Sequence, residues 1–355
     1  MLIRLRLRNL RGSKCFYCVS QERPSFSDMK MSKKPGNSFS KKGNIDEHKV
    51  MNTPSTYVAD KSLSLFEKYK TDPKDETALV DLTLAKKTQL THDSYVFKLD
   101  FPEGNENMVM GTDIARVIRF CKVLPTKEDP QGTMVMRYYT VSSPVDMKGS
   151  VEVPIKVYRA NEDPKYPDGG IMTSYLDKMK IGQRIKVLGP IERLQYYGNG
   201  LVRTGEKGPY DIVKKNHMIF VAAGSGITPY YRILKDALEH NDPTKFTLIY
   251  SNKTEDDIMF EKELEELALL YPHKFTYKKA ITYPINFEEL EEDTHIGKLT
   301  PEYLLEHLPE PSEDILVTNM GPNNFNKFFA EFIVKHTSYD PITQIFSRDV
   351  DSLIF

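Results

Sequence analysis

Residues 218–234 read MIFVAAGSGITPYYRIL, an unbroken apolar run that stops at a glycine. The run Met218 to Ala223 has the length and composition of a strand that is buried on both faces of a parallel sheet. Gly224 and Gly226 have no Cβ, so the backbone there can approach a ligand closely. Pro229 suits the first turn of a helix. The stretch therefore predicts a strand, a tight glycine turn and a helix N-terminus.

The start of the predicted helix is a candidate ligand site. The first N–H groups of a helix have no partner within the helix, and they favour phosphate. A phosphate-binding turn and a βα loop without a ligand both fit the pattern, because short glycine motifs also occur by chance.

Length and charge limit the classes of protein to consider. The chain has 355 residues, enough for two domains. Its 49 basic and 50 acidic residues give a formal charge of −1, which argues against nucleic acid as the main partner. Cys15 and Cys18 form an isolated CxxC pair, and Cys121 lies in an apolar run typical of a core. No stretch approaches the roughly 18 apolar residues of a membrane span, so we expect a soluble or peripherally attached chain.

The N-terminal 76 residues differ in composition from the rest of the chain. Residues 1–21 contain five basic residues and no acidic one, as in a mitochondrial transit peptide. A disordered basic tail on a cytoplasmic protein is the alternative. Residues 22–76 are rich in Ser, Lys, Pro, Asn and Asp, so we expect a linker with one short helix near 63–69.

Residues 77–212 have the pattern of an antiparallel β domain. Short runs of β-forming residues are separated by turn sequences, and most of them follow one another without a helix. This pattern predicts a six-stranded antiparallel barrel. The expected strands are 79–84, 94–99, 114–123, 137–142, 151–158 and 184–188, with a helix over 172–179.

Residues 213–355 alternate between strand and helix patterns, which predicts a parallel sheet covered by helices. The polar segment 198–215 is expected to be a loop between the two domains. Thr254 and Asp257 form a capping box at the start of the second helix. The expected strands are 218–223, 246–251, 275–281 and 315–318, and the expected helices are 229–240, 255–270, 300–307 and 322–335.

Residues 137–143, RYYTVSS, are a second candidate site. In a strand, Arg137 and Tyr139 project from one face and Thr140 from the other. An arginine two residues from a tyrosine can hold a phosphate while the ring covers an aromatic heterocycle. Taken by itself, the stretch also fits an exposed strand with a salt-bridged arginine.

The two candidate sites belong to a set of five motifs that occur in a fixed order. They are Arg137-x-Tyr139-Thr140-x-x-Ser143, Ile155-Lys156-Val157-Tyr158, Gly169-Gly170-x-Met172-Thr173-x-Tyr175-Leu176, Gly224-Ser225-Gly226-Ile227-Thr228-Pro229, and Gly321-Pro322 after a strand. In order and spacing they resemble the motifs of NADH-cytochrome b5 reductases, within the ferredoxin reductase-like superfamily. The resemblance spans roughly residues 78–346, and five motifs in register are a more specific signal than any one of them.

The resemblance implies a flavin barrel and a pyridine-nucleotide domain, with the flavin ring at their junction. By the family's pattern, Arg137 contacts the FAD phosphate and Tyr139 packs on the isoalloxazine ring. Hydroxyl contacts near the ring and its ribityl chain are implied for Thr140 and Ser143. Tyr158 lines the flavin site, with Lys156 facing the incoming nucleotide.

The remaining motifs imply contacts with the FAD diphosphate, with the nicotinamide nucleotide and with the nicotinamide ring. The FAD diphosphate is assigned to the paired glycines and the helix that follows, at Gly169, Gly170, Met172 and Thr173. The nicotinamide nucleotide is assigned to the glycine turn, at Gly224, Ser225, Gly226, Thr228 and Pro229. The wall against which the nicotinamide lies is assigned to Met320, Gly321 and Pro322.

The reaction implied by the resemblance needs no acid, base or metal from the protein. NAD(P)H gives a hydride to flavin N5, and the reduced flavin passes electrons one at a time to a haem-protein acceptor such as cytochrome b5. NADH is the expected donor, with NADPH as the alternative.

The chain departs from the family's pattern at three places. Met320 replaces the usual cysteine before Gly-Pro, and Ile171 replaces a lysine that is common after the paired glycines. Thr282 occupies the position of an acidic residue that disfavours NADPH in the animal enzymes. With Lys278 and Lys279 close to it in sequence, we expect relaxed discrimination between the two nucleotides.

Two other interpretations remain open. In the first, the chain is a subunit or interaction protein that has the reductase fold but weak or lost catalysis. In the second, it is a related reductase with a quinone or ferric-chelate acceptor. Met320 and Ile171 motivate the first alternative, whereas retention of Arg137, Tyr139 and the glycine turn favours a catalytic reductase. The acidic residues between 288 and 292 are interpreted as a solvated loop, and residues 347–355 extend beyond the resemblance.

Overall fold

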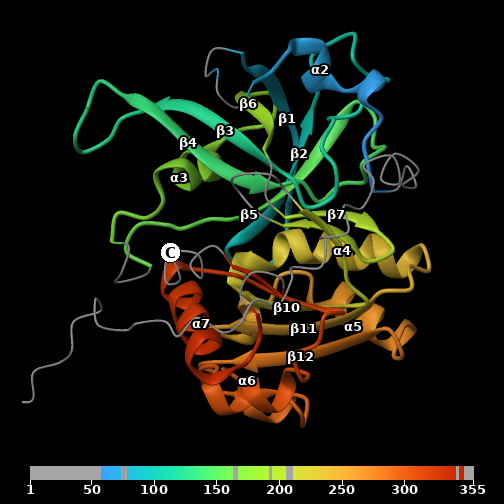
Figure 1. Ribbon diagram of the computed structural model, residues 1–355. Coiled ribbons are helices and arrows are strands. Elements are labelled where there is room, and N and C mark those ends of the chain that lie inside the picture. Colours follow the sequence, from blue (N-terminus) through green and yellow to red (C-terminus); the bar gives the residue numbers. More distant parts are fainter. Residues whose placement is uncertain are drawn as a thin grey trace, which may run out of the picture. The chain divides into compact units, whose positions relative to one another are not determined.

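The computed structural model describes residues 57–72, 75, 78–162, 167–191, 194–204, 211–340 and 344–347. The transit-like segment, the Cys15–Cys18 pair, most of the predicted linker and the extension after residue 347 lie outside these residues. The described residues form two six-stranded sheets and one three-stranded sheet (Figure 1).

The first six-stranded sheet is antiparallel, with strand order β4-β3-β6-β1-β2-β5. The sheet curls so that its two edge strands approach each other. Ser142 N, just after edge strand β4, donates a hydrogen bond of 2.9 Å to Glu152 O on the other edge strand, β5. The prediction of a six-stranded antiparallel barrel is therefore confirmed. Its elements are β1 (Val80–Gln89), β2 (Ser94–Asp100), β3 (Val117–Leu124), β4 (Thr133–Thr140), β5 (Ser150–Lys156), α3 (Ile171–Lys178) and β6 (Arg184–Ile191).

The barrel strands form because apolar residues alternate with polar ones along them. In β1, Val80, Leu82 and Leu84 are buried, whereas the intervening Asp81 and Thr83 are partly exposed. This period of two places one face of each strand in a common core. Cys121 is buried in the barrel, as predicted.

The second six-stranded sheet is parallel, with strand order β13-β12-β11-β10-β14-β15. Helices cover both of its faces: Phe220 belongs to the core beneath α4 and α5, whereas Val221 belongs to the core beneath α6 and α7. The predicted parallel α/β domain is confirmed. Its elements are β10 (His217–Ala223), η2 (Gly224–Ile227), α4 (Thr228–Glu239), β11 (Lys245–Asn252), η3 (Glu255–Asp257), α5 (Glu261–Leu270), β12 (Phe275–Ile281), η4 (Phe287–Glu289), β13 (His295–Ile296), α6 (Pro301–His307), β14 (Ile315–Met320), α7 (Asn323–His336) and β15 (Ile345–Phe346).

The prediction of a loop over 198–215 is wrong. The segment contributes to a small antiparallel sheet of β7 (Gln195–Gly198), β8 (Leu201–Thr204) and β9 (Asp211–Lys214). These strands have only four residues each, so their alternation is hard to see among polar neighbours, but Tyr196 and Val202 are fully buried. The predicted domain boundary at residue 212 falls inside β9.

The helix expected from residue 255 begins later. The capping box of Thr254 and Asp257 is present, but it caps the start of the single 3-10 turn η3 and not the start of an α-helix. Phe260 then adopts a left-handed conformation with φ of 60°, which interrupts the helical path before α5 begins at Glu261.

The last part of the predicted linker packs against the rest of the protein. The expected short helix is present as α2 (Leu65–Tyr69), preceded by the 3-10 turn η1 (Lys61–Leu63). Tyr57, Leu65 and Phe66 are buried in the cores, so residues 57–72 belong to the folded body. Among the helices that the structure describes, none combines the length and hydropathy of a membrane span.

Candidate active site

A cavity of about 430 Å³ lies where the barrel meets the glycine turn of the parallel sheet. The barrel contributes β4, β5 and the N-terminus of α3, and the nucleotide half contributes Ser225 and Thr228. Eleven of the predicted cofactor-binding residues line this one cavity: Arg137, Tyr139, Thr140, Lys156, Tyr158, Gly169, Gly170, Met172, Thr173, Ser225 and Thr228. The two sequence motifs that first suggested a site therefore share one cleft.

Strand β4 presents Arg137 and Tyr139 to the cavity. The Tyr139 ring packs on the buried Phe120 ring, with centroids 4.8 Å apart, so its position is supported from below. Burial raises the pKa of Tyr139, so its hydroxyl is neutral at physiological pH. Arg137 is exposed, and Nη1 donates a hydrogen bond of 2.7 Å to the carbonyl of Met136. That bond leaves guanidinium N–H groups to bind an anion.

The N-terminus of α3 lines the side of the cavity where the FAD diphosphate is predicted to lie. Gly170 is the N-cap, and among the described residues no side chain caps it. A Cβ at Gly170 would lie 2.3 Å from Thr173 Oγ1, and one at Gly169 would lie 2.6 Å from the carbonyl of Tyr158. Only glycines allow this close packing, which leaves uncapped N–H groups of the helix facing the cavity.

These residues fit a flavin dinucleotide. Tyr139 and Tyr158 offer aromatic surface, Arg137 offers charge-assisted donors, and the N-terminus of α3 offers N–H groups and a favourable dipole for a diphosphate. The cavity also lies within the size range of about 300–1,000 Å³ that is usual for small-ligand sites.

Seven of the predicted cofactor residues do not line the cavity. Ser143 is buried, and its Oγ accepts a hydrogen bond of 3.1 Å from Glu152 N, so its contact with a ribityl chain stays a prediction. The other six lie along the carboxyl ends of β10 and β14, the edge where parallel sheets bind ligands. They are Gly224, Gly226, Pro229, Met320, Gly321 and Pro322.

Gly226 packs directly on the predicted nicotinamide wall. A Cβ at Gly226 would lie 2.1 Å from the carbonyl oxygen of Met320 and 2.9 Å from Gly321 N. Behind the wall, Asn326 Nδ2 donates a hydrogen bond of 3.0 Å to Gly321 O, and Asn319 Nδ2 donates one of 3.1 Å to Asn326 Oδ1. The wall peptide is thus held between the glycine turn and the start of α7.

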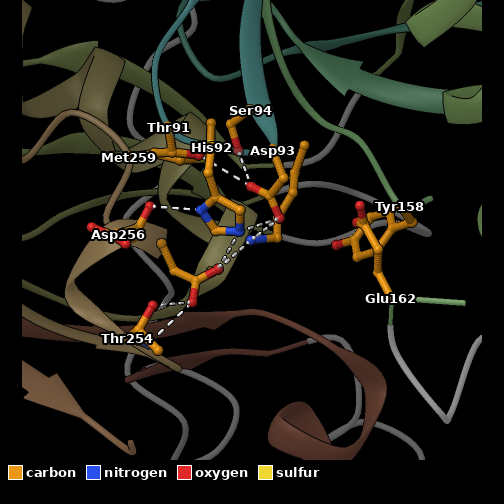
Figure 2. Close-up of polar contacts among 12 residues, drawn as sticks. Thr91, His92, Asp93, Ser94, Tyr158, Glu162, Thr254, Asp256 and Met259 are labelled. Carbon is orange, nitrogen blue, oxygen red and sulfur yellow. Dashed lines mark hydrogen bonds and ion pairs between the residues drawn. The ribbon is translucent and has the colours of Figure 1, made fainter. Parts of the chain in front are cut away.

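A charged cluster joins the barrel to the nucleotide half at one side of the cavity (Figure 2). Lys156 Nζ, at the end of β5, lies 2.8 Å from Asp93 Oδ2 and 2.7 Å from Asp257 Oδ1. Asp93 follows β1, and Asp257 belongs to the capping box of η3, where its Oδ2 accepts from Thr254. His92 Nδ1 lies 3.1 Å from the carbonyl oxygen of Asp256.

Burial lowers the pKa of Lys156, but the hydrogen bonds and charges of Asp257 and Asp93 outweigh burial, and the net pKa is raised. Burial raises the pKa of Asp257, but its contacts with Lys156 and Thr254 prevail, and the net pKa is lowered. Lys156 and Asp257 are therefore both charged over the physiological pH range. His92, Asp93 and Asp257 could offer metal ligands, but the ammonium of Lys156 already contacts both carboxylates.

Some of these contacts were not anticipated from the sequence. His92 and Asp93 lie between the predicted strands 79–84 and 94–99, and Asp257 is predicted only as part of a helix cap. The capping box was a usable signal for Asp257, since its position was correct, but nothing local links it to Lys156, which is 101 residues away.

Comparison with known proteins identifies the fold and the family. The oxidoreductase FAD-binding domain model matches residues 81–196, and the oxidoreductase NAD-binding domain model matches residues 220–331. The chain is 36% identical over 260 residues to NADH-cytochrome b5 reductase 2 of Xenopus laevis, covering 72% of this chain and 84% of that protein. The chain belongs to the NADH-cytochrome b5 reductase family.

Other relatives of this b5 reductase family member agree with the assignment. NADH-cytochrome b5 reductase 2 of Homo sapiens is 33% identical over 251 residues, covering 70% of this chain and 87% of that protein. Nitrate reductase [NADH] 1 of Oryza sativa subsp. japonica is 34% identical over 274 residues, but the match covers only 28% of its length against 76% of this chain. The family consists of NADH-dependent FAD oxidoreductases.

A solved structure shows the same fold. The cytochrome b5 reductase domain of Ulva prolifera nitrate reductase superposes with a TM-score of 0.68 at 23% sequence identity, covering 78% of this chain and 98% of that domain. The antiparallel barrel followed by a parallel α/β domain is thus the reductase fold.

The structure shows the surroundings of Ile171 and of the two lysines near Thr282. Ile171 lines the cavity and is 42% exposed, so an apolar side chain stands at the predicted diphosphate side, where the family's pattern often has a lysine. Lys278 Nζ lies 2.8 Å from Asp293, and Lys279 Nζ lies 2.8 Å from Glu265 and 2.9 Å from Glu291. Both ammonium groups are paired with carboxylates, which weakens the expectation that they attract the extra phosphate of NADPH.

Proposed function

We propose that the protein takes a hydride from NADH onto FAD and passes single electrons to a haem-protein acceptor such as cytochrome b5. The observation that carries the proposal is the shared cavity, in which Tyr139 of the barrel and Ser225 and Thr228 of the glycine turn line the same space. The names of the relatives support the choice of NADH and of cytochrome b5.

The residues of the chain bind and align, and bound FAD supplies the redox chemistry. Arg137 and the N-terminus of α3 hold the phosphates, and Tyr139 supports one face of the flavin ring. The turn at Gly224 carries the nucleotide diphosphate, while Met320 and Gly321 set the depth of the nicotinamide. Such alignment can supply about 7–11 kcal/mol of a reaction barrier without an acid or base from the protein.

The decisive experiment uses the full chain, because residues 57–72 contribute to both cores. The purified protein is loaded with FAD, its visible spectrum is recorded, and NADH is added anaerobically, followed by ferric cytochrome b5. We expect a yellow protein that NADH bleaches and cytochrome b5 recolours. A protein that does not retain FAD supports the non-catalytic alternative. If NADH bleaches the flavin, and the reduced flavin passes electrons to a quinone or ferric chelate but not to cytochrome b5, the result supports a related reductase with that acceptor.

We also propose that residues 1–21 direct the protein to mitochondria. Five basic residues without an acidic one support the proposal. An import assay on the full chain and on a chain without residues 1–30 tests it. Equal import of the two chains, or import of neither, would favour a cytoplasmic protein with a basic tail.

A further inference from the structure

Residues 57–72, which precede the region that the family models match, run across both cores. We call them the strap. Tyr57 and Ala59 belong to the core that contains β10 and α4, whereas Leu65 and Phe66 belong to the barrel core. All four side chains are at most 5% exposed. The strap therefore places buried side chains in both halves of the protein.

At its first end, the strap is anchored on Asp242, in the loop after α4. Tyr57 Oη donates a hydrogen bond of 3.1 Å to Asp242 Oδ2, which also accepts from Tyr196 Oη at 2.8 Å and from Asn199 N at 2.6 Å. Asp242 is 3% exposed, so these donors satisfy a buried carboxylate. The Tyr57 ring packs edge-on against the Tyr196 ring at 5.6 Å.

At its other end, the strap is fastened to the barrel. Leu65 N donates a hydrogen bond of 2.8 Å to Val109 O, and Val109 N donates one of 3.0 Å to Leu63 O. Thr71 Oγ1 donates a hydrogen bond of 2.6 Å to Gly189 O of β6. Buried apolar side chains and backbone bonds together make this a stable attachment.

Two glycines leave space for the strap. A Cβ at Gly198 would lie 2.4 Å from the Tyr57 ring, and one at Gly111 would lie 1.8 Å from Ser64 Oγ. Both glycines have positive φ, 85° and 88° respectively, a conformation that other residues rarely adopt. The surfaces under the strap are shaped to receive it.

The strap contacts the loop that follows helix α4, and this helix begins at the cavity. Helix α4 starts at Thr228, which lines the cavity, and leads at its far end to Asp242. Near its middle, Arg232 Nη1 donates a hydrogen bond of 3.1 Å to Ser142 O, just after β4. Helix α4 is thus attached to the barrel near its middle and, through Asp242 and the strap, beyond its far end.

We propose that the strap sets the distance between the nicotinamide and flavin halves of the cavity, with Tyr57 as the positioning residue. The proposal rests on the proposed function, because it concerns hydride transfer across that cavity. Loss of Tyr57 removes one of the three donors to Asp242 Oδ2 and empties the recess beside Gly198, while Tyr196 and Asn199 still hold Asp242. This loosens the far end of α4 and lets Thr228 and the glycine turn shift relative to Tyr139.

The test compares Tyr57→Ala with Tyr69→Ala in the full chain. Tyr69 is in the same strap but 38% exposed, so its removal controls for the loss of a tyrosine. We expect Tyr57→Ala to keep its flavin and to be reduced by saturating NADH about tenfold to a hundredfold more slowly, as a displacement on the order of 1 Å would cause. Tyr69→Ala should match the unaltered chain.

A second rate separates positioning from general damage. The second rate is that at which ferricyanide reoxidises flavin that was reduced with dithionite. This reaction does not involve the nucleotide-binding half, so its rate should be unchanged in Tyr57→Ala. An unchanged rate of reduction by NADH, even with a lower melting temperature, would overturn the proposal. So would equal losses in reduction and in reoxidation, since they would indicate a damaged flavin site.

Two safeguards keep the outcome decisive. If Tyr57→Ala does not fold, Tyr57→Phe, which keeps the ring in its recess and loses only the bond to Asp242, is measured in the same two assays, with the same outcomes for and against. If NADH fails to reduce the unaltered chain, the proposed function is wrong. If the unaltered chain is reduced by NADH and Tyr57→Ala is reduced at the same rate, the proposal about the strap is wrong and the proposed function stands.

Discussion

Lys156 of β5 and Asp257 of η3 join the flavin-binding barrel to the nucleotide-binding half, with 2.7 Å between Nζ and Oδ1. Asp93 completes the arrangement from the barrel side at 2.8 Å. The side chains are only 10–13% exposed, so solvent screens the contact weakly. A single lysine thereby links strand β5, which lines the cavity, to the turn after β11.

Replacing Asp257 with asparagine removes one charge from this link. We expect Asp257→Asn to lower the free energy of unfolding by about 1.5–3 kcal/mol, the usual contribution of a hydrogen bond to a charged group. Lys156 keeps Asp93 as a partner, which limits the loss. Urea denaturation measures it, with Asp256→Asn as the control, because the neighbouring Asp256 side chain is exposed. Equal midpoints for the two variants would contradict this prediction.

The stability difference between the unaltered chain and Asp257→Asn should depend on pH in a defined direction. The lowered pKa of Asp257 means that its contribution is present above the ordinary aspartate pKa of 3.8 and is lost as pH falls through the folded value. The raised pKa of Lys156 means that its contribution is present below 10.5 and is lost as pH rises through the folded value. We therefore expect a constant difference between about pH 5 and 9 that shrinks in stronger acid. Denaturation curves across that range would refute the assignment if the difference peaked near pH 6.

Arg137→Ala should weaken FAD retention. The substitution removes a charge-assisted contact worth on the order of 1.5–3 kcal/mol, or roughly a tenfold to hundredfold change in the dissociation constant. Titration of the apoprotein with FAD, followed by flavin fluorescence, measures the change. Arg119→Ala is the matched control, because Arg119 is bonded to Tyr138 Oη and does not line the cavity. Equal flavin affinity in the two variants would remove Arg137 from the site.

Gly226→Ala should slow flavin reduction without loss of flavin. The added methyl group would lie 2.1 Å from Met320 O, so the nicotinamide wall has to move. We expect the rate of flavin reduction by NADH to fall at least about tenfold, as a displaced reactant implies. Gly182→Ala is the control for backbone strain away from the site: a methyl group there meets no described atom within 4 Å, but its φ of 87° is one that alanine rarely adopts. This variant should lose stability and keep the normal rate. A normal rate in Gly226→Ala would show that the wall does not position the nucleotide.

Met320→Cys tests the departure from the family's pattern. Met320 is the last residue of β14 and is partly exposed, and it borders the turn at Gly226. Cysteine is smaller and stiffer than methionine, so we expect unchanged flavin content and a changed rate of flavin reduction by NADH. Anaerobic stopped-flow measurements at saturating NADH give the rate. Identical rates in the two proteins would mean that the substitution at this position is silent.

The local features of the fold could be predicted from the sequence because each has a short-range cause. The apolar run before Gly224, the alternation in β1 and the prolines at helix starts all act over a few residues. The same is true of Arg137 and Tyr139, which share a strand face two residues apart. Where the alternation was too short, as in β7 to β9, or where a left-handed residue intervened, as at Phe260, the local signal was misleading.

The sequence by itself determined the two domain types and the order of the motifs, because periodicity and glycine placement depend only on neighbours along the chain. The residues expected to contact the flavin follow from the resemblance to the family and stay predictions. Only the tertiary structure decided which distant groups meet. Lys156 and Asp257 are 101 residues apart, and Tyr57 and Asp242 are 185 residues apart. No local preference encodes such pairs, since they form only when burial of the two cores brings the segments together and leaves each carboxylate in need of a donor.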